Sequence, residues 1–413
     1  MEIRPIISAL MRSKVALILI GLQIALTLAI VCNALFIISQ RIDSMGRPSG
    51  MNETDTFMIT SNGFGAKFDT KNTFIEDMAM IRNLPGVVDA SPINSLPMSD
   101  SGWSEAINMA PGQKVATTVT TMYFFDEHGI NAHGVNLIAG RNFKPEEISI
   151  RDRAAVDWPP NVIITQALAN KLFPGQDAVG KQFYLSDPDH TPPMTVIGVV
   201  ERMMAPWPRS FSYNGDRSVV DFSVLVPQKV AYGSRTAYVV RAEPGRRDEV
   251  MKTVETKMTE SNHNRIVRSL KSVEQIRAEC YAEDRAMMII LSTVIFCLLT
   301  ITALGIVGMA SFWVTQRTKQ IGTRRALGAT RASILRYFLT ENFLITTGGL
   351  LLGAFLTYAF SLWLMAHAQE GKLLPWHYVP VGFVCLWLLG QLAVLGPATR
   401  AARVPPAVAT RSV

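Results

Sequence analysis

Residues 286–314 read AMMIILSTVIFCLLTITALGIVGMASFWV, a stretch of 29 residues without a charged side chain. A helix needs about 20 apolar residues to cross the hydrocarbon core of a bilayer. Three more apolar runs, at residues 15–39, 338–365 and 379–396, come close to this length or exceed it. The chain has a mean hydropathy of +0.20 and only 18% charged residues. The sequence therefore predicts an α-helical membrane protein with four transmembrane helices and a large non-membrane part.

The charged residues separate by position along the chain. Residues 40–285 hold 27 Lys/Arg and 30 Asp/Glu, whereas the rest of the chain holds 13 basic and 3 acidic residues. Twelve of these 13 basic residues fall on one side of an alternating four-helix topology, which the positive-inside rule makes the cytoplasmic side. We expect both termini in the cytoplasm and residues 40–285 outside. The basic excess thus describes orientation, and it gives no reason to expect nucleic acid as a partner.

The first apolar run needs comparison with a secretory signal peptide, since a short basic segment precedes it. The run is longer than a usual signal core, and no small-residue cleavage motif follows it directly, so we interpret it as an uncleaved helix. Residues 1–14 suggest a helix in the membrane interface, with a frayed N-terminus as the alternative. In chain order we expect this cytoplasmic interfacial helix at 1–14, transmembrane helix 1 at 15–39, an α+β core domain at 40–272, a stalk helix at 273–285, transmembrane helix 2 at 286–314, a cytoplasmic coupling loop or helix at 315–337, transmembrane helix 3 at 338–365, an external loop at 366–378, transmembrane helix 4 at 379–396 and a cytoplasmic tail at 397–413.

The external segment alternates short apolar strand patterns with helical ones, which is typical of an α+β domain. Its length suffices for two subdomains, one of them inserted into the other, at a boundary that the pattern leaves open. Of the four cysteines, only Cys280 lies outside the predicted spans. We therefore expect the stability of this domain to come from core burial and not from an intrachain disulfide.

The end of the external segment predicts a long helix. Ser272 and Gln275 form a capping box, and no Gly or Pro follows until Gly305. A continuous helix over residues 273–314 would extend about 20 Å beyond the bilayer as a rigid stalk. The alternative is a soluble helix joined to the membrane helix through a kink. A rigid rod would suit a protein that transmits force.

Two patterns resemble catalytic motifs but fail on inspection. Residues 175–181 read GQDAVGK, yet Gln182 replaces the Ser/Thr of a phosphate-binding loop and a strand follows, so we interpret them as a structural turn. The spacing of four possible metal ligands fits no strong metal-site motif, so we interpret these residues as part of a solvated loop: Asp126, Glu127, His128 and His133. The sequence predicts no catalytic, cofactor-binding or metal-binding residue, and hence no enzyme.

The predicted spans contain a single charged group, Glu341, near the cytoplasmic end of the third. Intramembrane charges normally mark ion pathways, so a proton-driven carrier is disfavoured. We expect Glu341 to bond a neighbouring helix or the basic loop rather than to take part in transport. Small residues allow membrane helices to approach closely. The positions that suggest such packing are Gly305, Gly308, Gly349 and Gly353.

The loop after residue 314 carries the most specific pattern. Residues 316–342 read QRTKQIGTRRALGATRASILRYFLTEN, and the elements R-T-x-x-I-G-x-R-x-A-x-G-A strongly resemble the FtsX-like permeases of MacB-type ABC transporters. In the external segment, GRNF at 140–143, VIITQALANKLFPG at 162–175 and TVIGVV at 195–200 resemble the periplasmic core domain of that family. PATRAARVPPAVA at 397–409 resembles its C-terminal tail. The resemblance covers nearly the whole chain.

The resemblance implies that the basic loop couples the chain to an ATPase. The residues matching or adjoining the pattern are Gln316, Arg317, Thr318, Ile321, Gly322, Arg324, Arg325, Ala326, Gly328 and Ala329. Two departures matter: the family often has Glu where Gln316 stands, and no nucleotide-binding motif accompanies the permease. We therefore expect ATP and Mg²⁺ to bind a separate partner ATPase, and no cofactor to bind this chain.

The resemblance further implies a bacterial inner-membrane location with the large domain in the periplasm. The expected partners are a cytoplasmic ABC ATPase dimer, a second permease chain, identical or a paralogue, and membrane lipids. A periplasmic adaptor and an outer-membrane duct are further possible partners. The expected function is ATP-driven movement of the periplasmic domain for export or extraction of a substrate. The alternative is a signalling module that senses a ligand or activates an envelope enzyme without transport.

Overall fold

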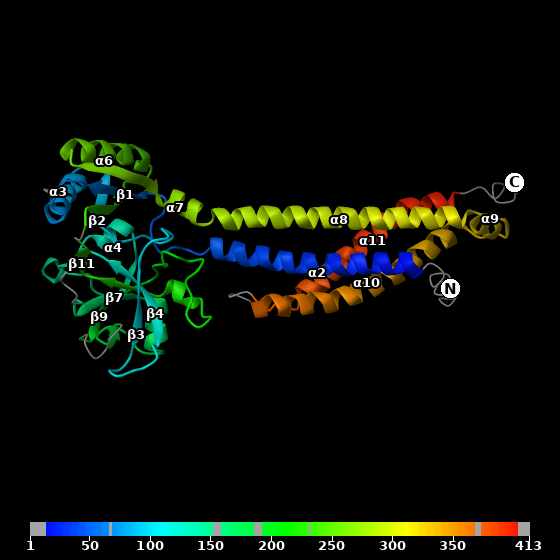
Figure 1. Cartoon of the computed structure of the whole chain (residues 1–413), viewed down its shortest axis with the longest axis horizontal. Coiled ribbons are helices and arrows are strands. Elements are labelled where there is room, and N and C mark those ends of the chain that lie inside the picture. Colours follow the sequence, from blue (N-terminus) through cyan, green and yellow to red (C-terminus); the bar gives the residue numbers. More distant parts are fainter. Residues whose placement is uncertain are drawn as a thin grey trace. The chain divides into compact units, whose positions relative to one another are not determined.

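The computed structural model describes residues 14–65, 68–151, 158–185, 192–230, 233–367 and 373–403. The chain divides into two compact units (Figure 1). The helical unit contains the two ends of the chain, Met1–Asp43 and Asp284–Val413, and the α+β unit contains Ser44–Glu283. The predicted helix at 1–14, apart from Lys14, and most of the predicted tail at 397–413 lie outside the described residues.

In the described residues, four helices are long and apolar enough to cross a membrane. They are α2 (Lys14–Met45), α8 (Ala282–Gln316), α10 (Arg331–His367) and α11 (Tyr378–Ala402). The short helix α9 (Thr318–Ala326) lies between α8 and α10. The prediction of four transmembrane helices is thus confirmed. Each helix extends beyond its apolar run, because the polar residues at its ends continue the same backbone hydrogen bonding.

Close contacts hold α2 against α10 and α10 against α11. A Cβ atom added at Gly349 would lie 2.8 Å from the carbonyl oxygen of Gly21, and one at Gly353 would lie 3.0 Å from the carbonyl oxygen of Ala25. Asn342 donates to the carbonyl of Gly390 over 3.0 Å. Small residues and satisfied polar groups are what allow membrane helices to pack without a hydrophobic driving force between them.

The α+β unit contains a four-stranded antiparallel sheet in the order β13-β1-β12-β2. Its elements are β1 (Thr56–Gly63), α3 (Thr70–Arg82), β2 (Val87–Pro92), β12 (Arg235–Ala242), α6 (Arg247–Ser261) and β13 (Arg265–Ser272). Apolar side chains of the sheet, α3 and α6 form one core. Inside it, Asp77 of α3 accepts a 2.6 Å hydrogen bond from the hydroxyl of Tyr238 and pairs with Arg265, which removes the cost of a lone buried charge.

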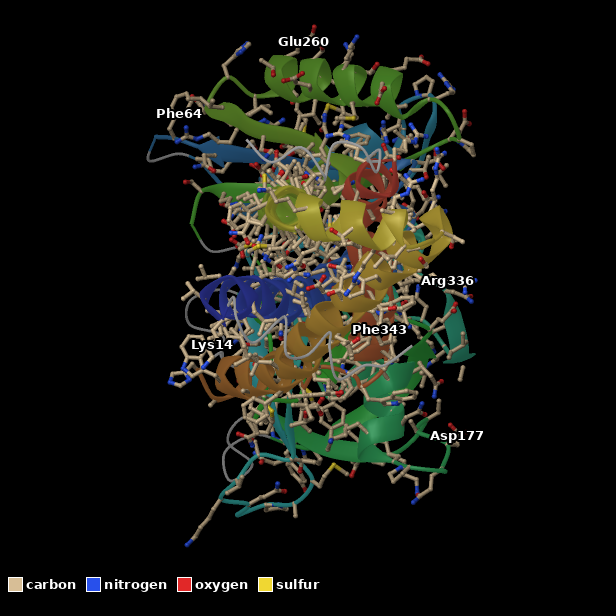
Figure 2. The ribbon with its side chains drawn as sticks, turned by 90° about the vertical axis from the view of Figure 1, so that its right-hand side faces the viewer. Lys14, Phe64, Asp177, Glu260, Arg336 and Phe343 are labelled. Carbon is tan, nitrogen blue, oxygen red and sulfur yellow. The ribbon has the colours of Figure 1, made fainter. Side chains whose placement is uncertain are left out.

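A second sheet is inserted between β2 and β12. It runs β5-β9-β7-β10-β4-β3-β8, and β8 also pairs with β9, so the strands from β9 to β8 close into a ring. The elements of this subdomain are β3 (Trp103–Asn108), β4 (Thr118–Phe124), α4 (Gly129–His133), β5 (Leu137–Gly140), η2 (Pro145–Glu147), β6 (Ser149–Arg151), β7 (Asn161–Thr165), α5 (Gln166–Leu172), β8 (Gln182–Leu185), β9 (Met194–Val200), η3 (Ser218–Asp221), β10 (Ser223–Val226) and β11 (Gln228–Val230). β6 and β11 form a separate two-stranded parallel sheet. Figure 2 shows Asp177 of this subdomain and Glu260 of α6 at opposite ends of the unit.

The predicted unbroken helix over residues 273–314 is wrong at one position. Helix α7 (Val273–Cys280) ends at Tyr281, whose φ of −100° and ψ of 16° depart from helical values, and α8 begins at Ala282. The side chain of Tyr281 is only 2% exposed and packs in a core of the α+β unit with Val273 and Ile276. Tertiary burial of the tyrosine, rather than a Gly or Pro, accompanies this interruption of the helix.

Candidate functional site

The chain turns twice between α8 and α10, and α9 lies between the turns. Arg317 separates α8 from α9, and the hydroxyl of Thr318 donates to the carbonyl of Val314 over 3.0 Å. At the other end, Gly328 has a φ of +95°, which a residue with a Cβ atom adopts only with strain. The amide of Ala329 donates to the carbonyl of Arg324 over 3.0 Å, as in a helix C-cap. The glycine thus allows the chain to reverse before α10 begins.

An ion pair fastens the first turn to α10. Two oxygens of Glu341 accept from the Arg317 guanidinium at 2.9 and 3.0 Å. Glu341 is 1% exposed, so its charge depends on this partner. The Arg317 guanidinium also lies 5.7 Å from the ring centroid of Trp313. The prediction that Glu341 bonds the basic loop is confirmed.

The other two predicted arginines also contact the helical unit. Arg324 lies over the Tyr337 ring at 5.1 Å, and Arg325 donates to the carbonyl of Ala402, the last residue of α11, over 3.0 Å. The arginines therefore orient α9 on α10 and α11. The Arg317 guanidinium is already paired with the buried carboxylate of Glu341, so we assign Arg317 to the support of α9 and not to the surface that a partner contacts.

The predicted coupling residues divide into an inner and an outer group. Ile321 and Gly322 are buried, and Ile321 packs in the core of the helical unit. The exposed members are Gln316, Arg324, Ala326 and Gly328, while Arg317, Thr318, Arg325 and Ala329 are half-buried. Leu327, which the sequence pattern did not single out, is 82% exposed between these basic and small residues. Arginine is enriched at protein interfaces, and an exposed leucine beside it supplies apolar area that a partner protein can bury.

The four predicted packing glycines behave differently. Gly349 and Gly353 are buried against α2, as described above. A Cβ at Gly305 would meet the side chain of Gln23 on α2 at 2.9 Å, whereas one at Gly308 would have no atom within 4 Å. Three of the four positions thus lie at contacts within the helical unit. Elsewhere on α10, Arg336 and Phe343, both labelled in Figure 2, are exposed.

The two rejected motifs have different outcomes. Residues 175–181 form the turn between α5 and β8, with Gly175 and Gly180 at φ values of +71° and +84°. The prediction of a structural turn is confirmed. The prediction of a solvated loop at Asp126 and His133 is wrong, because both side chains are fully buried.

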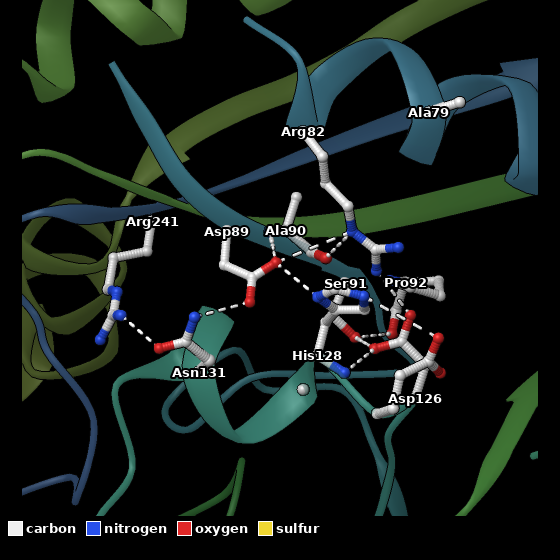
Figure 3. Close-up of polar contacts among 12 residues, drawn as sticks. Ala79, Arg82, Asp89, Ala90, Ser91, Pro92, Asp126, His128, Asn131 and Arg241 are labelled. Carbon is white, nitrogen blue, oxygen red and sulfur yellow. Dashed lines mark hydrogen bonds and ion pairs between the residues drawn. The ribbon is translucent and has the colours of Figure 1, made fainter. Parts of the chain in front are cut away.

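Asp126 and His128 belong to a polar network that joins the two subdomains (Figure 3). Asp126 accepts from Arg82 at 2.8 Å and from the hydroxyl of Ser91 at 2.7 Å. Asp89 contacts Nδ1 of His128 at 2.9 Å. The partners come from α3 and β2, far from residue 126 in the sequence, so local polarity suggested exposure where tertiary partners allow burial. Among the described residues, no group of three or more His, Cys, Asp or Glu could hold a metal ion.

A further arrangement that the sequence did not reveal lies at the two connections of the α+β unit. Arg277 of α7 bonds both oxygens of Glu53 at 2.6 Å. The same guanidinium donates to the carbonyl oxygens of Met45 at 2.9 Å and Arg47 at 3.0 Å. These bonds tie α7 to the segment that follows α2. The capping box located α7, but nothing local in the sequence points to its distant partners.

A membrane unit of four long apolar helices, with a basic helix between the second and third and a large α+β unit after the first, defines a multi-pass membrane protein with an extracytoplasmic domain. The family profile of the MacB-like periplasmic core domain matches residues 15–257, and that of the FtsX-like permease C-terminal region matches residues 292–406. The chain belongs to the MacB/FtsX-like family of ABC transporter permeases.

Several curated sequences resemble the chain at low identity. The uncharacterized ABC transporter permease YknZ of Bacillus subtilis is 24% identical over 297 residues, which cover 71% of this chain and 70% of YknZ. The macrolide export ATP-binding/permease protein MacB of Rhodospirillum rubrum is 28% identical, covering 62% of this chain and 41% of that protein. The MacB of a Shewanella species is 25% identical over 410 residues, covering 96% and 58%. The chain thus spans about half the length of these MacB relatives.

Among solved structures, the periplasmic region of MacB from Actinobacillus actinomycetemcomitans aligns with 57% of this chain and 97% of that chain, with a TM-score of 0.34 and 13% identity. The extracellular domain of YknZ aligns with 51% of this chain and 100% of that chain, with a TM-score of 0.31 and 13% identity.

Proposed function

We propose that this chain is the permease subunit of a MacB-like ABC transporter, in which a partner ATPase moves the extracytoplasmic unit to export or extract a substrate. The observation that carries the proposal is α9. It presents exposed basic residues, the exposed Leu327 follows it directly, and the Arg317–Glu341 ion pair fastens its first turn to α10. Such a surface suits a partner protein that binds α9 and displaces it.

The contacts of the helical unit supply a route for the movement. A partner that engages Leu327 and Arg324 would shift α9, and the ion pair would pass the shift to α10. Gly349 and Gly353 lie against the backbone of α2, so α10 and α2 would move together. Close packing transmits displacement because interiors have little free volume. The helices α2 and α8 then lead directly into the α+β unit.

We place ATP and Mg²⁺ in a separate ABC ATPase dimer, and both termini of this chain in the cytoplasm of a bacterium with the α+β unit in the periplasm. We further propose a second permease chain at α8, since α8 is the least buried of the four spans within the unit. Its exposed apolar residues include Phe296 and Leu304. These side chains need lipid or another helix as a neighbour.

The test uses the full chain in lipid nanodiscs with its ATPase. Leu327→Asp places a carboxylate in the centre of the proposed interface, so we expect both co-purification of the ATPase and its stimulation by the permease to be lost. Lys257→Glu, on the exposed face of α6 in the other unit, is the matched control and should behave as the parent chain. Normal binding and stimulation in the Leu327→Asp variant would disprove the assignment of α9.

A further inference from the structure

Aromatic rings gather where α10 ends and α11 begins. On α10, the ring of Trp363 stacks on those of Phe360 and His367, with centroid distances of 5.8 and 4.8 Å. In the segment before α11, Trp376 contacts His377 with 6.3 Å between ring centroids. Trp363 is 54% exposed and Trp376 is 75% exposed. The described chain therefore leaves more than half of each of these two side chains uncovered.

A hydrogen bond places the two indoles at the same end of the helical unit. The amide of Leu374 donates to the hydroxyl of Ser361 over 3.0 Å, and Leu374 is only 2% exposed. This buried bond fastens the segment before α11 to the last turns of α10. Trp363 follows Ser361 by two positions, and Trp376 follows Leu374 by two positions. The two rings thus share one level although they belong to separate elements.

The distance from this aromatic level to the basic end of the unit matches the thickness of a bilayer. On α10, the helix from the exposed Arg336 to Trp363 is about 40 Å long. On α11, the helix from Tyr378 to the exposed Arg400 is about 33 Å long. The hydrocarbon core of a bilayer measures about 30 Å, and the headgroup regions extend it to about 40–45 Å. The aromatic level and the arginines therefore fit the two surfaces of one membrane.

Tryptophan suits the boundary between lipid and water. Its large ring favours an apolar neighbour, while its N–H group needs a hydrogen-bond acceptor. The hydrocarbon core offers no acceptor, and bulk water offers no apolar surface. Phospholipids supply both at one depth, because their ester and phosphate oxygens adjoin their acyl chains. The chemistry of two exposed indoles at this level thus matches the headgroup region of a leaflet.

The other two spans differ at this end of the unit. Residues 30–45 of α2 and 282–300 of α8 contain neither tryptophan nor tyrosine. Phe36 of α2 packs on Tyr378, with 5.5 Å between ring centroids. Arg41 and Asp284 form an ion pair there, with 2.7 Å between nitrogen and oxygen. The exposed tryptophans at this level therefore come from α10 and from the segment before α11.

We propose that Trp363 and Trp376 lie in the headgroup region of the extracytoplasmic leaflet and bind phospholipid there. The membrane surface then crosses α2 near Phe36, since this ring packs beside the first residue of α11. From Phe36 to Arg41 the helix continues for about 8 Å, so the ion pair of Arg41 lies outside the hydrocarbon core. This lipid contact goes beyond the coupling function and does not depend on it.

The test measures the quenching of tryptophan fluorescence in the full chain, in nanodiscs of phosphatidylcholine brominated at a chosen depth. Bromine at the sixth and seventh acyl carbons quenches indoles close to the headgroups. Bromine at the eleventh and twelfth carbons quenches indoles close to the bilayer centre. Comparing the parent with Trp363→Phe and with Trp376→Phe isolates the emission of each indole, and the phenylalanine keeps an aromatic ring at the position.

Two tryptophans elsewhere in the chain serve as references. Trp387 lies about 14 Å along α11 from Tyr378, so Trp387→Phe isolates an indole close to the bilayer centre. Trp158 is buried in the inserted subdomain, so Trp158→Phe isolates an indole that neither lipid reaches.

We expect the shallow bromines to quench Trp363 and Trp376 at least about twofold more strongly than the deep bromines, because quenching requires close approach and the two levels are about 14 Å apart. The order should reverse for Trp387. Stronger quenching of Trp363 and Trp376 by the deep bromines would overturn the proposal.

Iodide, which stays in water, separates the remaining neighbours. Quenching of the two indoles by iodide without quenching by bromine would place them in water. Quenching by neither would place them against another protein chain. Either result would contradict a lipid contact. The ATPase is absent from this measurement, so failure of the lipid proposal and failure of the coupling proposal are distinguishable.

Discussion

Acidification should destabilise the α+β unit through His133. This side chain is fully buried and stacks on Phe125 with 4.3 Å between ring centroids. Its Nδ1 donates to the carbonyl of Gly129 over 2.7 Å, while Nε2 has no partner among the described residues. Burial disfavours the imidazolium, and although the Gly129 bond opposes this effect, the pKa of His133 falls from 6.5 to about 4.

The magnitude follows from this difference in pKa. Each pKa unit corresponds to about 1.4 kcal/mol, so protonation of the unfolded chain favours unfolding by about 3 kcal/mol in total. The contribution of His133 to the free energy of unfolding is fully present above pH 6.5, because the imidazole is then neutral in both the folded and the unfolded state. As the pH falls from 6.5 to 4, the unfolded state binds the proton first, and this stability is lost progressively. Below pH 4 both states are protonated and no further loss arises from His133.

The assay is urea unfolding of the full chain in nanodiscs, followed by tryptophan fluorescence between pH 7 and pH 4.5. Trp158 is buried in the inserted subdomain and reports on the α+β unit. His133→Phe keeps an aromatic ring on Phe125 but cannot bind a proton. Carboxylates titrate equally in both proteins, so the difference between the two pH profiles isolates the histidine. If both proteins lost the same free energy of unfolding over this range, the reasoning would be refuted.

Three further outcomes are expected. Gly353→Leu should lower the melting temperature of the helical unit, because its Cβ would press on the backbone of α2, whereas Gly308→Leu, with no atom within 4 Å, should not. Gly328→Val forces a β-branched residue to a φ of +95°, so ATPase stimulation should fall while membrane insertion, measured by fractionation, stays normal. The turn at Lys181 should show no saturable binding of Mg·ATP by calorimetry, and micromolar affinity there would contradict its assignment as structural.

The spans and the large domain could be predicted because hydropathy and charge act locally along the chain. The interruption at Tyr281 could not, since no Gly or Pro marks it and it coincides with the burial of a tyrosine in a core of the α+β unit. Asp126 was missed for the same reason: its partner Arg82 lies on another element. The Arg317–Glu341 ion pair was predicted only from Glu341, because a carboxylate within a membrane span needs a polar or cationic partner nearby.

At the candidate site, the sequence pattern of the basic loop predicted which residues form the site but not which of their side chains are buried and which are exposed. Ile321 and Leu327 are both aliphatic residues of the same loop, yet one is buried and the other is 82% exposed. Helix periodicity alone does not decide which face of a nine-residue helix is inward. That choice is made by the packing of α9 on α10 and α11.

The insertion of the ring of strands between β2 and β12 has a consequence for how the protein is made. During synthesis β1 and β2 emerge early, but their partners β12 and β13 follow only after the entire ring. Pairings this far apart in sequence carry a large loop-closure entropy and form slowly. The two ends of the insertion meet where Pro92 of β2 lies opposite Tyr238 of β12. The ring can therefore fold first and bring these ends together, so that the outer sheet is completed only as the chain enters α7.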